Sequence, residues 1–178
     1  QGRIATRSTH TKMGLPEVQI GLLPGGGGTQ RLPRLIGIQK ALEMMLTGKS
    51  LNAFRAKKIG LIDEITDEGK LLQAALVMAK KLIQKPIVRK SNLPLSSKIL
   101  ESAIGRGLLF KQARKMAFKR SQGNYPAIPA IIDCVETSYK KGLKAGYEKE
   151  LEEFERLMLT PESAALRAIF FSMTNNKK

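Results

Sequence analysis

The chain has 178 residues, of which 42% are hydrophobic, so it can bury the core of one ordinary domain but hardly of two. No stretch reaches the roughly 18 to 20 uncharged apolar residues that a membrane-spanning helix needs, which excludes a transmembrane segment. The formal net charge of +16 is regional, with 10 basic and 2 acidic groups in residues 1–60, 4 acidic groups in 61–69, 13 basic groups and one acidic group in 70–120, and 8 of each in 121–178.

The basic regions attract phosphates of any kind, so the charge alone leaves a nucleic acid, another phosphate-bearing ligand and a plain solvated face all open. The chain has three Tyr, six Phe and no Trp that could stack on bases, and no recognisable nucleic-acid-binding motif accompanies the charge.

Single residues add little. Cys134 is the one cysteine, so it has no partner for an internal disulfide, and its apolar neighbours predict a core residue in a reducing compartment. His10 is the one histidine and lacks companions at metal-ligand spacing, which predicts a structural or exposed residue and no metal site.

The first 85 residues predict short elements punctuated by glycine, as expected where a sheet gives way to covering helices. Asn52 and Thr29 are predicted N-caps, and Gly37 and Gly48 are predicted helix ends. The expected elements are a strand over 3–9, a loop leading into a short buried turn or strand over 15–23, helices over 30–36, 38–47 and 53–59, a strand over 61–65, and a helix over 70–84 that Pro86 stops.

The remainder is helical in pattern. A basic connector bounded by prolines is expected over 86–94, followed by helices over 96–120, 127–145 and 147–158. Thr160 as N-cap and Pro161 at the first helical position open a last helix that reaches residue 173.

The stretch that indicates chemistry is Pro16-Glu17, eight residues before the run Gly25-Gly26-Gly27-Gly28. A carboxylate among apolar neighbours has its charged form disfavoured, which suits a group that exchanges protons, and glycines leave backbone N–H groups free to approach a ligand. Taken alone, a glutamate after proline is more often a surface or capping residue. The spacing also fits neither a P-loop nor a dinucleotide-binding loop.

A longer pattern is more specific. The segment Leu15-Pro16-Glu17 through Gly25-Gly26-Gly27-Gly28-Thr29-Gln30-Arg31-Leu32-Pro33, continued by Ala41-Leu42-Glu43-Met44-Met45-Leu46-Thr47-Gly48 and Ala56-Lys57-Lys58-Ile59-Gly60-Leu61-Ile62-Asp63, closely resembles the enoyl-CoA hydratase/isomerase (crotonase) family. Further on, Gln122-Gly123-Asn124-Tyr125-Pro126-Ala127 and Thr160-Pro161-Glu162-Ser163 resemble the tail of the hydratase domain in bifunctional fatty-acid oxidation alpha subunits.

The resemblance implies roles for four residues. Glu17 matches the general acid/base that adds water across the double bond of a trans-2-enoyl-CoA, and Gly25 matches the glycine whose N–H holds the catalytic water. Gly26 and Pro16 complete the expected water- and substrate-binding positions. The family's second catalytic glutamate and both oxyanion-hole N–H groups belong to segments upstream of Gln1. Because the loss of one oxyanion donor already costs about 10²–10³ in rate, we expect these 178 residues to be inactive alone.

The resemblance also implies an α/β crotonase-like fold, a superhelix of ββα turns, truncated at its N-terminus and mostly α-helical after residue 70. Residues 1–69 are expected to form the C-terminal part of the core, and residues 70–178 a helical region that ends in a linker helix. The removal of the preceding turns exposes a sheet edge and apolar faces, so we expect the chain either to associate through them or to keep mainly its helices.

The predicted function is enoyl-CoA hydration in fatty-acid β-oxidation, with enoyl-CoA isomerisation as a second activity. The alternative is a non-catalytic assembly segment or a basic nucleic-acid-binding module. We expect a cytoplasmic protein with an acyl-CoA substrate, no nucleic acid, and either self-association or a thiolase subunit as partner. No cofactor is expected for hydration, since NAD serves only the dehydrogenase domain that follows in the bifunctional alpha subunits.

Overall fold

The computed structural model describes residues 2–85 and 102–175. The first half contains short elements joined by tight turns. They are β1 (Ile4–Thr6), the 3₁₀ turn η1 (Glu17–Ile20), α1 (Gly28–Ile36), α2 (Ile38–Thr47), α3 (Ala53–Lys58), β2 (Glu64–Thr66), the 3₁₀ turn η2 (Glu68–Lys70) and α4 (Leu71–Gln84). The second half contains only helices in its described part: α6 (Ala103–Ser121), α7 (Ala127–Lys141), α8 (Leu143–Met158) and α9 (Pro161–Asn175).

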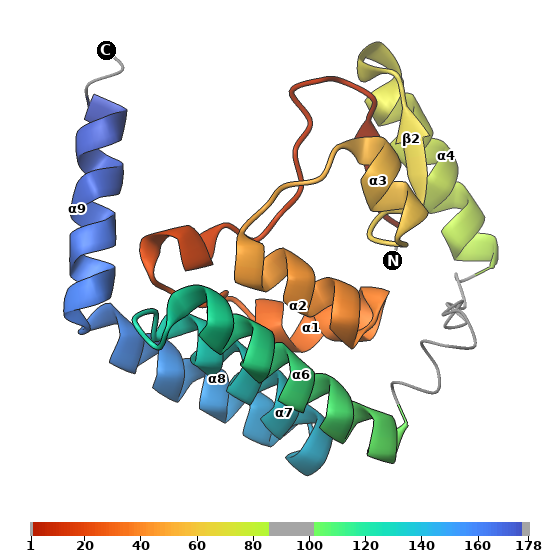
Figure 1. The fold of residues 1–178 in the computed structure, drawn as a ribbon. Coiled ribbons are helices and arrows are strands. Elements are labelled where there is room, and N and C mark those ends of the chain that lie inside the picture. Colours follow the sequence, from red (N-terminus) through yellow and green to blue (C-terminus); the bar gives the residue numbers. More distant parts are fainter. Residues whose placement is uncertain (1, 86–101, 176–178) are drawn as a thin grey trace.

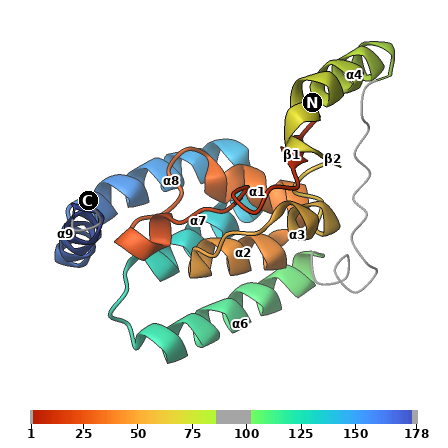
Figure 2. The same ribbon diagram turned by 90° about the horizontal axis from the view of Figure 1, so that it is seen from above.

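The main core lies between helices that are far apart in the sequence. α1 and α2 pack on each other and on α7, and α8 and α6 flank α7 (Figures 1 and 2). Fully buried side chains from both halves meet there, among them Leu23, Ile36, Met45, Ile131 and Leu157. The helical body is therefore held together mainly by apolar burial between the two halves of the chain.

α7 and α8 form a close helical hairpin. Gly142 joins them with a φ of 94°, a conformation that favours glycine. Further into α8, Gly146 faces Ser138 so closely that a Cβ at position 146 would lie 2.5 Å from the Ser138 Cβ. The absence of a side chain at Gly146 therefore sets the distance between the two helices.

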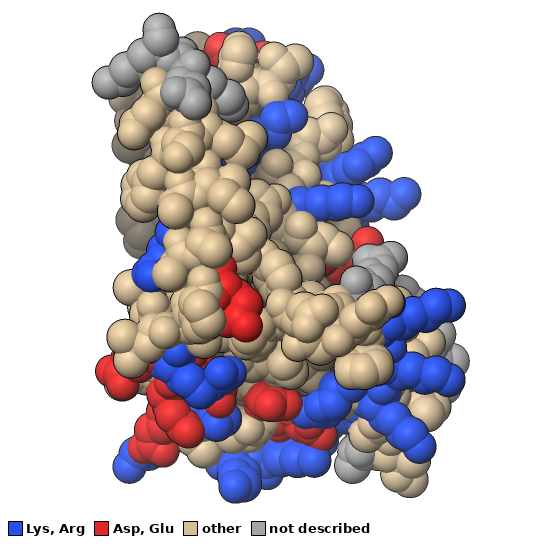
Figure 3. Space-filling view, turned by 60° about the vertical axis from the view of Figure 1, so that its left-hand side comes forward, with Lys and Arg blue, Asp and Glu red and all other residues tan. Residues whose placement is uncertain are grey.

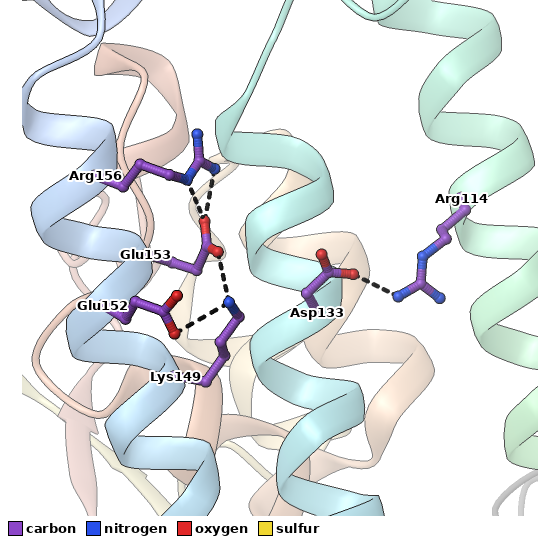
Figure 4. A network of polar contacts seen from close by, with 6 residues as sticks. All are labelled: Arg114, Asp133, Lys149, Glu152, Glu153 and Arg156. Carbon is purple, nitrogen blue, oxygen red and sulfur yellow. Dashed lines mark hydrogen bonds and ion pairs between the residues drawn. The ribbon is translucent and has the colours of Figure 1, made fainter.

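α6 docks on α7 through polar as well as apolar contacts. The Arg114 guanidinium lies 2.5 Å from carboxylate oxygens of both Asp133 and Glu136, and Figure 4 shows the bond to Asp133 reaching across from α6 to α7. Burial disfavours the charge of Glu136, but hydrogen bonds from Lys140 and Arg114 outweigh it and lower the pKa of the carboxyl. On its other side α6 leaves a cavity of about 410 Å³ against α2, lined largely by apolar side chains such as Leu46, Leu109 and Met116.

β1, β2, α3 and α4 form a smaller unit beside the helical body (Figure 1). The two strands are parallel, with Ala5 opposite Ile65, and Arg3 hydrogen-bonds Asp63 just before β2. The small core of this unit consists of Ala53, Ala56 and Ile62 with a few half-buried neighbours. α4 packs on β1 yet has no buried residue, and its Leu72 and Ile83 are 74% and 84% exposed.

α9 projects from the helical body (Figure 1). Thr160 caps it by accepting a hydrogen bond from the Ser163 N–H at 3.3 Å, as predicted. Its surface in Figure 3, the column at the upper left, is almost wholly uncharged, and it exposes Ile169, Phe170, Phe171 and Met173. Among the described residues, every helix is too short or too polar to span a bilayer.

Most predicted elements are present. The helices ended by Gly48 and capped by Asn52 begin and end within one residue of the prediction, and the Asn52 side chain accepts from the Arg55 N–H. His10 is exposed and Cys134 is buried, as predicted. The expected connector over 86–94 and the start of the helix predicted from 96 lie outside the described residues.

Four predictions were wrong in detail. The strands are shorter than expected, three residues each, and the second begins at Glu64 rather than Leu61. The break between the long C-terminal helices falls at Gly142, not after residue 145. Thr29 is not an N-cap, because α1 begins one residue earlier at Gly28 and Gly27 occupies the capping position without a side chain.

Candidate active site

The turn η1, which carries Glu17, is held from three sides. The Tyr125 hydroxyl donates to the Val18 carbonyl at 2.6 Å, and the Ser163 hydroxyl donates to the Ile20 carbonyl at 3.2 Å. The Gln19 side-chain amide donates to the Gly48 carbonyl at 3.1 Å. Partners before α7, in α9 and after α2 thus fix a turn of four residues, a degree of restraint that an ordinary surface loop does not need.

The Glu17 carboxylate is partly buried. One of its oxygens, Oε2, is shielded from solvent and has no hydrogen-bond partner among the described residues. Buried polar atoms in folded proteins are nearly always paired, so an unpaired carboxylate oxygen needs an explanation such as a catalytic role or a bound water. Pro16 precedes it on the surface with a φ of −85° and sets the entry into η1.

The glycine run forms a tight turn immediately before α1. Gly27 has a φ of 83°, which favours glycine, and its carbonyl accepts the first hydrogen bonds of the helix. Gly25 and Gly26 are exposed, whereas Leu23 and Pro24 just before them are buried. The turn is thus anchored at its base and open at its tip.

The segment that leads into Pro16-Glu17 contacts the glycine turn. A Cβ on Gly28 would lie 3.3 Å from the Leu15 side chain, so residue 15 packs against the end of the turn. The fold therefore brings the segment before Glu17 against the glycine segment, although Gly25 lies eight positions after Glu17 in the sequence.

Glu150 of α8 completes this arrangement, and the sequence reasoning missed it. Its carboxylate is 2% exposed and accepts from the Gly27 N–H at 2.6 Å, from the Thr29 N–H at 3.1 Å and from the Thr29 hydroxyl. A carboxylate at a helix N-terminus satisfies free N–H groups and is favoured by the helix dipole. No local signal pointed to Glu150, because Thr29 was itself predicted to cap this helix and a local pattern does not identify a partner more than a hundred residues away.

The described titratable side chains offer neither a metal site nor a reactive cysteine. Within residues 2–85 and 102–175, the His, Cys, Asp and Glu side chains form no group of three or more that could hold a metal ion. Burial raises the pKa of the Cys134 thiol to about 12, which makes it a poor nucleophile at neutral pH.

Comparison with known proteins shows the family of this chain. The sequence model described as enoyl-CoA hydratase/isomerase matches residues 3–155, which include η1, the glycine turn and Glu150. The chain belongs to the enoyl-CoA hydratase/isomerase family. The resemblance seen in the sequence is thereby confirmed.

Within the enoyl-CoA hydratase/isomerase family, the chain is similar to alpha subunits of fatty acid oxidation complexes. The chain is 51% identical over 179 residues to the fatty acid oxidation complex subunit alpha of Shewanella amazonensis, and 51% identical over 177 residues to that of Shewanella loihica. Each match covers 99% of this chain but 25% of the relative, so the chain spans about a quarter of the length of these proteins.

Solved structures show the fold of this hydratase/isomerase family member. Carnitinyl-CoA hydratase from Mycobacterium avium matches with a TM-score of 0.59 at 24% identity over 96% of this chain and 51% of that one. An enoyl-CoA hydratase/isomerase from Pseudoalteromonas atlantica matches with a TM-score of 0.58 at 19% identity over 97% of this chain and 54% of that one. The predicted crotonase-like fold, mostly helical after residue 70, is confirmed for the described residues.

Proposed function

We propose that this chain forms part of the active site of an enoyl-CoA hydratase of fatty-acid β-oxidation, with Glu17 as general acid/base. The observation that carries the proposal is the buried, unpaired Oε2 of Glu17 on a turn fixed from three sides. The names of the alpha-subunit relatives support a role in fatty-acid oxidation, and the family model supports the hydratase reaction. The expected substrate is a trans-2-enoyl-CoA, and isomerisation of the double bond is the expected second activity.

Hydration adds the elements of water across the carbon–carbon double bond next to the thioester. The hydroxyl bonds to C3 and a proton to C2, so the reaction needs a group that moves protons and a group that holds the water. We assign the first role to the Glu17 carboxyl and the second to the Gly25 N–H, with Gly26 and Pro16 beside them. The exposed tip of the turn at Gly25 and Gly26 supports this assignment, because these two residues have no side chain of their own between the backbone and solvent.

We expect hydration to need further segments of the family's domain. The solved relatives are about twice as long as the part that matches, and the resemblance places a second catalytic glutamate and the oxyanion hole in segments upstream. We therefore expect the 178 residues alone to show no measurable hydration of crotonyl-CoA. A normal rate from the purified chain would contradict this expectation.

The test uses a complete host protein. Residues 1–178 replace the matching quarter of the Shewanella amazonensis alpha subunit, and loss of the enoyl thioester absorbance of crotonyl-CoA measures hydration. Glu17→Gln should lower kcat by about 10²-fold or more, since positioned acid/base groups contribute about 10²–10⁴. Glu43→Gln is the matched control, because Glu43 is the other acidic residue in residues 1–60 and is exposed on α2. Equal activity of the two variants would overturn the role of Glu17.

The remaining assignments follow from the reaction. Hydration uses only water and the thioester, so no cofactor is needed, and NAD would serve a dehydrogenase domain such as the one expected downstream in the alpha subunits. We propose a cytoplasmic location, which the buried free thiol of Cys134 supports. We also propose either self-association or a thiolase subunit as protein partner, and the exposed apolar residues of α9 are compatible with both.

A further inference from the structure

One face of α8 contacts the glycine turn at its start and at its end. Gly146, Glu150 and Phe154 recur every four residues and therefore lie along one side of the helix. The Gly146 carbonyl accepts from the Gln30 amide at 3.1 Å, Glu150 binds Gly27 and Thr29, and Phe154 packs against Gly25. The contact at Gly25 is close, since a Cβ there would lie 2.5 Å from the Phe154 ring.

The charge of Glu150 is compensated in an unusual way. A buried carboxylate is costly unless it is fully hydrogen-bonded or paired with a cation. Its neighbour Lys149 contacts Glu152 and Glu153 instead, as Figure 4 shows, and Arg156 also pairs with Glu153. Glu150 instead accepts hydrogen bonds from two backbone N–H groups and the Thr29 hydroxyl, all at the end of the glycine turn.

A simple helix cap would satisfy one or two N–H groups and leave the preceding loop free. Here Glu150 accepts a hydrogen bond from the Gly27 N–H, and Gly27, with a φ of 83°, lies two residues after Gly25. Phe154 of the same helix packs against Gly25 itself. Donors that stabilise a reacting group act best when they are fixed before the reaction, because no energy is then spent on ordering them.

We propose that Glu150 is a positioning residue for hydration: it holds the glycine turn in the conformation that presents the Gly25 N–H to the catalytic water. The inference rests on the proposed function, because it takes the Gly25 N–H as the group that holds the water. Because Glu150 is buried and both its oxygens are bonded within the protein, we assign it an action through the backbone of Gly27 and Thr29.

The first test measures the turn directly in the 178-residue chain. Glu150→Gln replaces one carboxylate oxygen by an NH₂ group that cannot accept, and Glu148→Gln, exposed on the same helix, is the control. Glu150→Gln should accelerate amide hydrogen exchange at Gly27 and Thr29 by about tenfold or more. It should leave the exchange rates of Ile131 and Ile132 in α7 nearly unchanged. A uniform change at all four amides means general destabilisation and overturns the proposal, as does no change at Gly27 and Thr29.

The second test measures kinetics in the same chimeric alpha subunit. Glu150→Gln should lower kcat by about tenfold or more with little change in KM, since the turn positions water rather than the CoA group, and Glu150→Asp should recover part of the loss. If Glu17→Gln abolishes activity but Glu150→Gln leaves kcat unchanged, the positioning role is wrong and the proposed function stands. If Glu17→Gln has no effect, the proposed function fails. Faster exchange at Gly27 and Thr29 would then show only that Glu150 caps the helix, and the positioning role would be wrong as well.

Discussion

The two carboxylates near the glycine turn differ in one respect that separates their roles. Glu150 has both oxygens bonded to N–H and O–H donors, whereas Glu17 has a buried oxygen with no partner among the described residues. A fully bonded carboxylate stabilises a conformation, while an unpaired one keeps an acceptor free for a ligand. The same residue type thus serves structure at one position and is available for chemistry at the other.

Cys134 gives a pH prediction at the residue scale. Burial is the main cause that raises the pKa of its thiol to about 12, and the carboxylates of Glu153 and Glu150 add to it. In the unfolded chain the thiol ionises near 9.0, so above that pH the unfolded state binds fewer protons than the folded state. The free energy of unfolding should therefore fall as pH rises between about 9 and 12, by at most about 1.4 kcal/mol per pH unit from this thiol.

The comparison with Cys134→Ala isolates this contribution. Denaturant unfolding of both proteins over a series of pH values should give curves that run parallel below pH 9 and converge above it, because the variant has no thiol to ionise. Lysine and tyrosine titrations in this range are common to both proteins. Curves that remain parallel through the whole range would show that the thiol ionises alike in the folded and unfolded chains.

At the scale of the elements, the sequence predicted those helix ends that residues within the same turn determine. Asn52 caps α3 and Gly48 ends α2 because each acts on residues within one turn of itself. Thr29 has the same local signature as a cap, but its hydroxyl donates to Glu150 instead. A contact between residues so distant in the sequence depends on how α8 packs, which hydrophobic periodicity does not specify.

In the candidate site, too, the motif was predictable from the sequence, whereas the contacts between distant residues were not. The motif predicted that Glu17 lies near the glycine run, and the structure brings Leu15, two residues before Glu17, against Gly28. The three side chains that hold η1 come from separate parts of the chain: Gln19 within the turn, Tyr125 before α7 and Ser163 in α9. Tyr125 and Ser163 lay within the segments that resemble the hydratase tail, yet their contacts with η1 appear only in three dimensions.

Helix packing predicts that two Gly→Ala substitutions change the free energy of unfolding in opposite directions. Gly146→Ala places a methyl group against Ser138 and the buried Gln30 amide, so it should lower the free energy of unfolding by about 1–3 kcal/mol. Gly107→Ala lies on α6 with nothing within 4 Å and should raise it by about 0.5–1 kcal/mol through helix propensity. Urea unfolding followed by circular dichroism measures both. A Gly146→Ala variant as stable as the parent would mean that α7 and α8 can separate at little cost.

At the scale of the whole molecule, burial is unevenly distributed. The helical body contains the large core cluster, while the unit of β1, β2, α3 and α4 buries only Ala53, Ala56 and Ile62. Solved relatives of the same fold carry further chain of about equal length beyond the part that matches. α4 exposes its leucines and the sheet has only two strands, so we expect that further chain of this family would pack on these two surfaces.

Uneven burial predicts two levels of stability in the isolated chain. Segments with few buried apolar contacts open at lower free energy than the global unfolding reaction, so amides of β1, β2 and α4 should exchange faster than those of α1, α2 and α7. Hydrogen exchange with peptide-level mass spectrometry resolves these segments. Protection of α4 should rise when residues 1–178 are placed in the alpha-subunit chimera, because the additional chain covers its apolar side. Equal protection of α4 and α7 in the isolated chain would show instead that the small unit is as stable as the helical body and needs no covering partner.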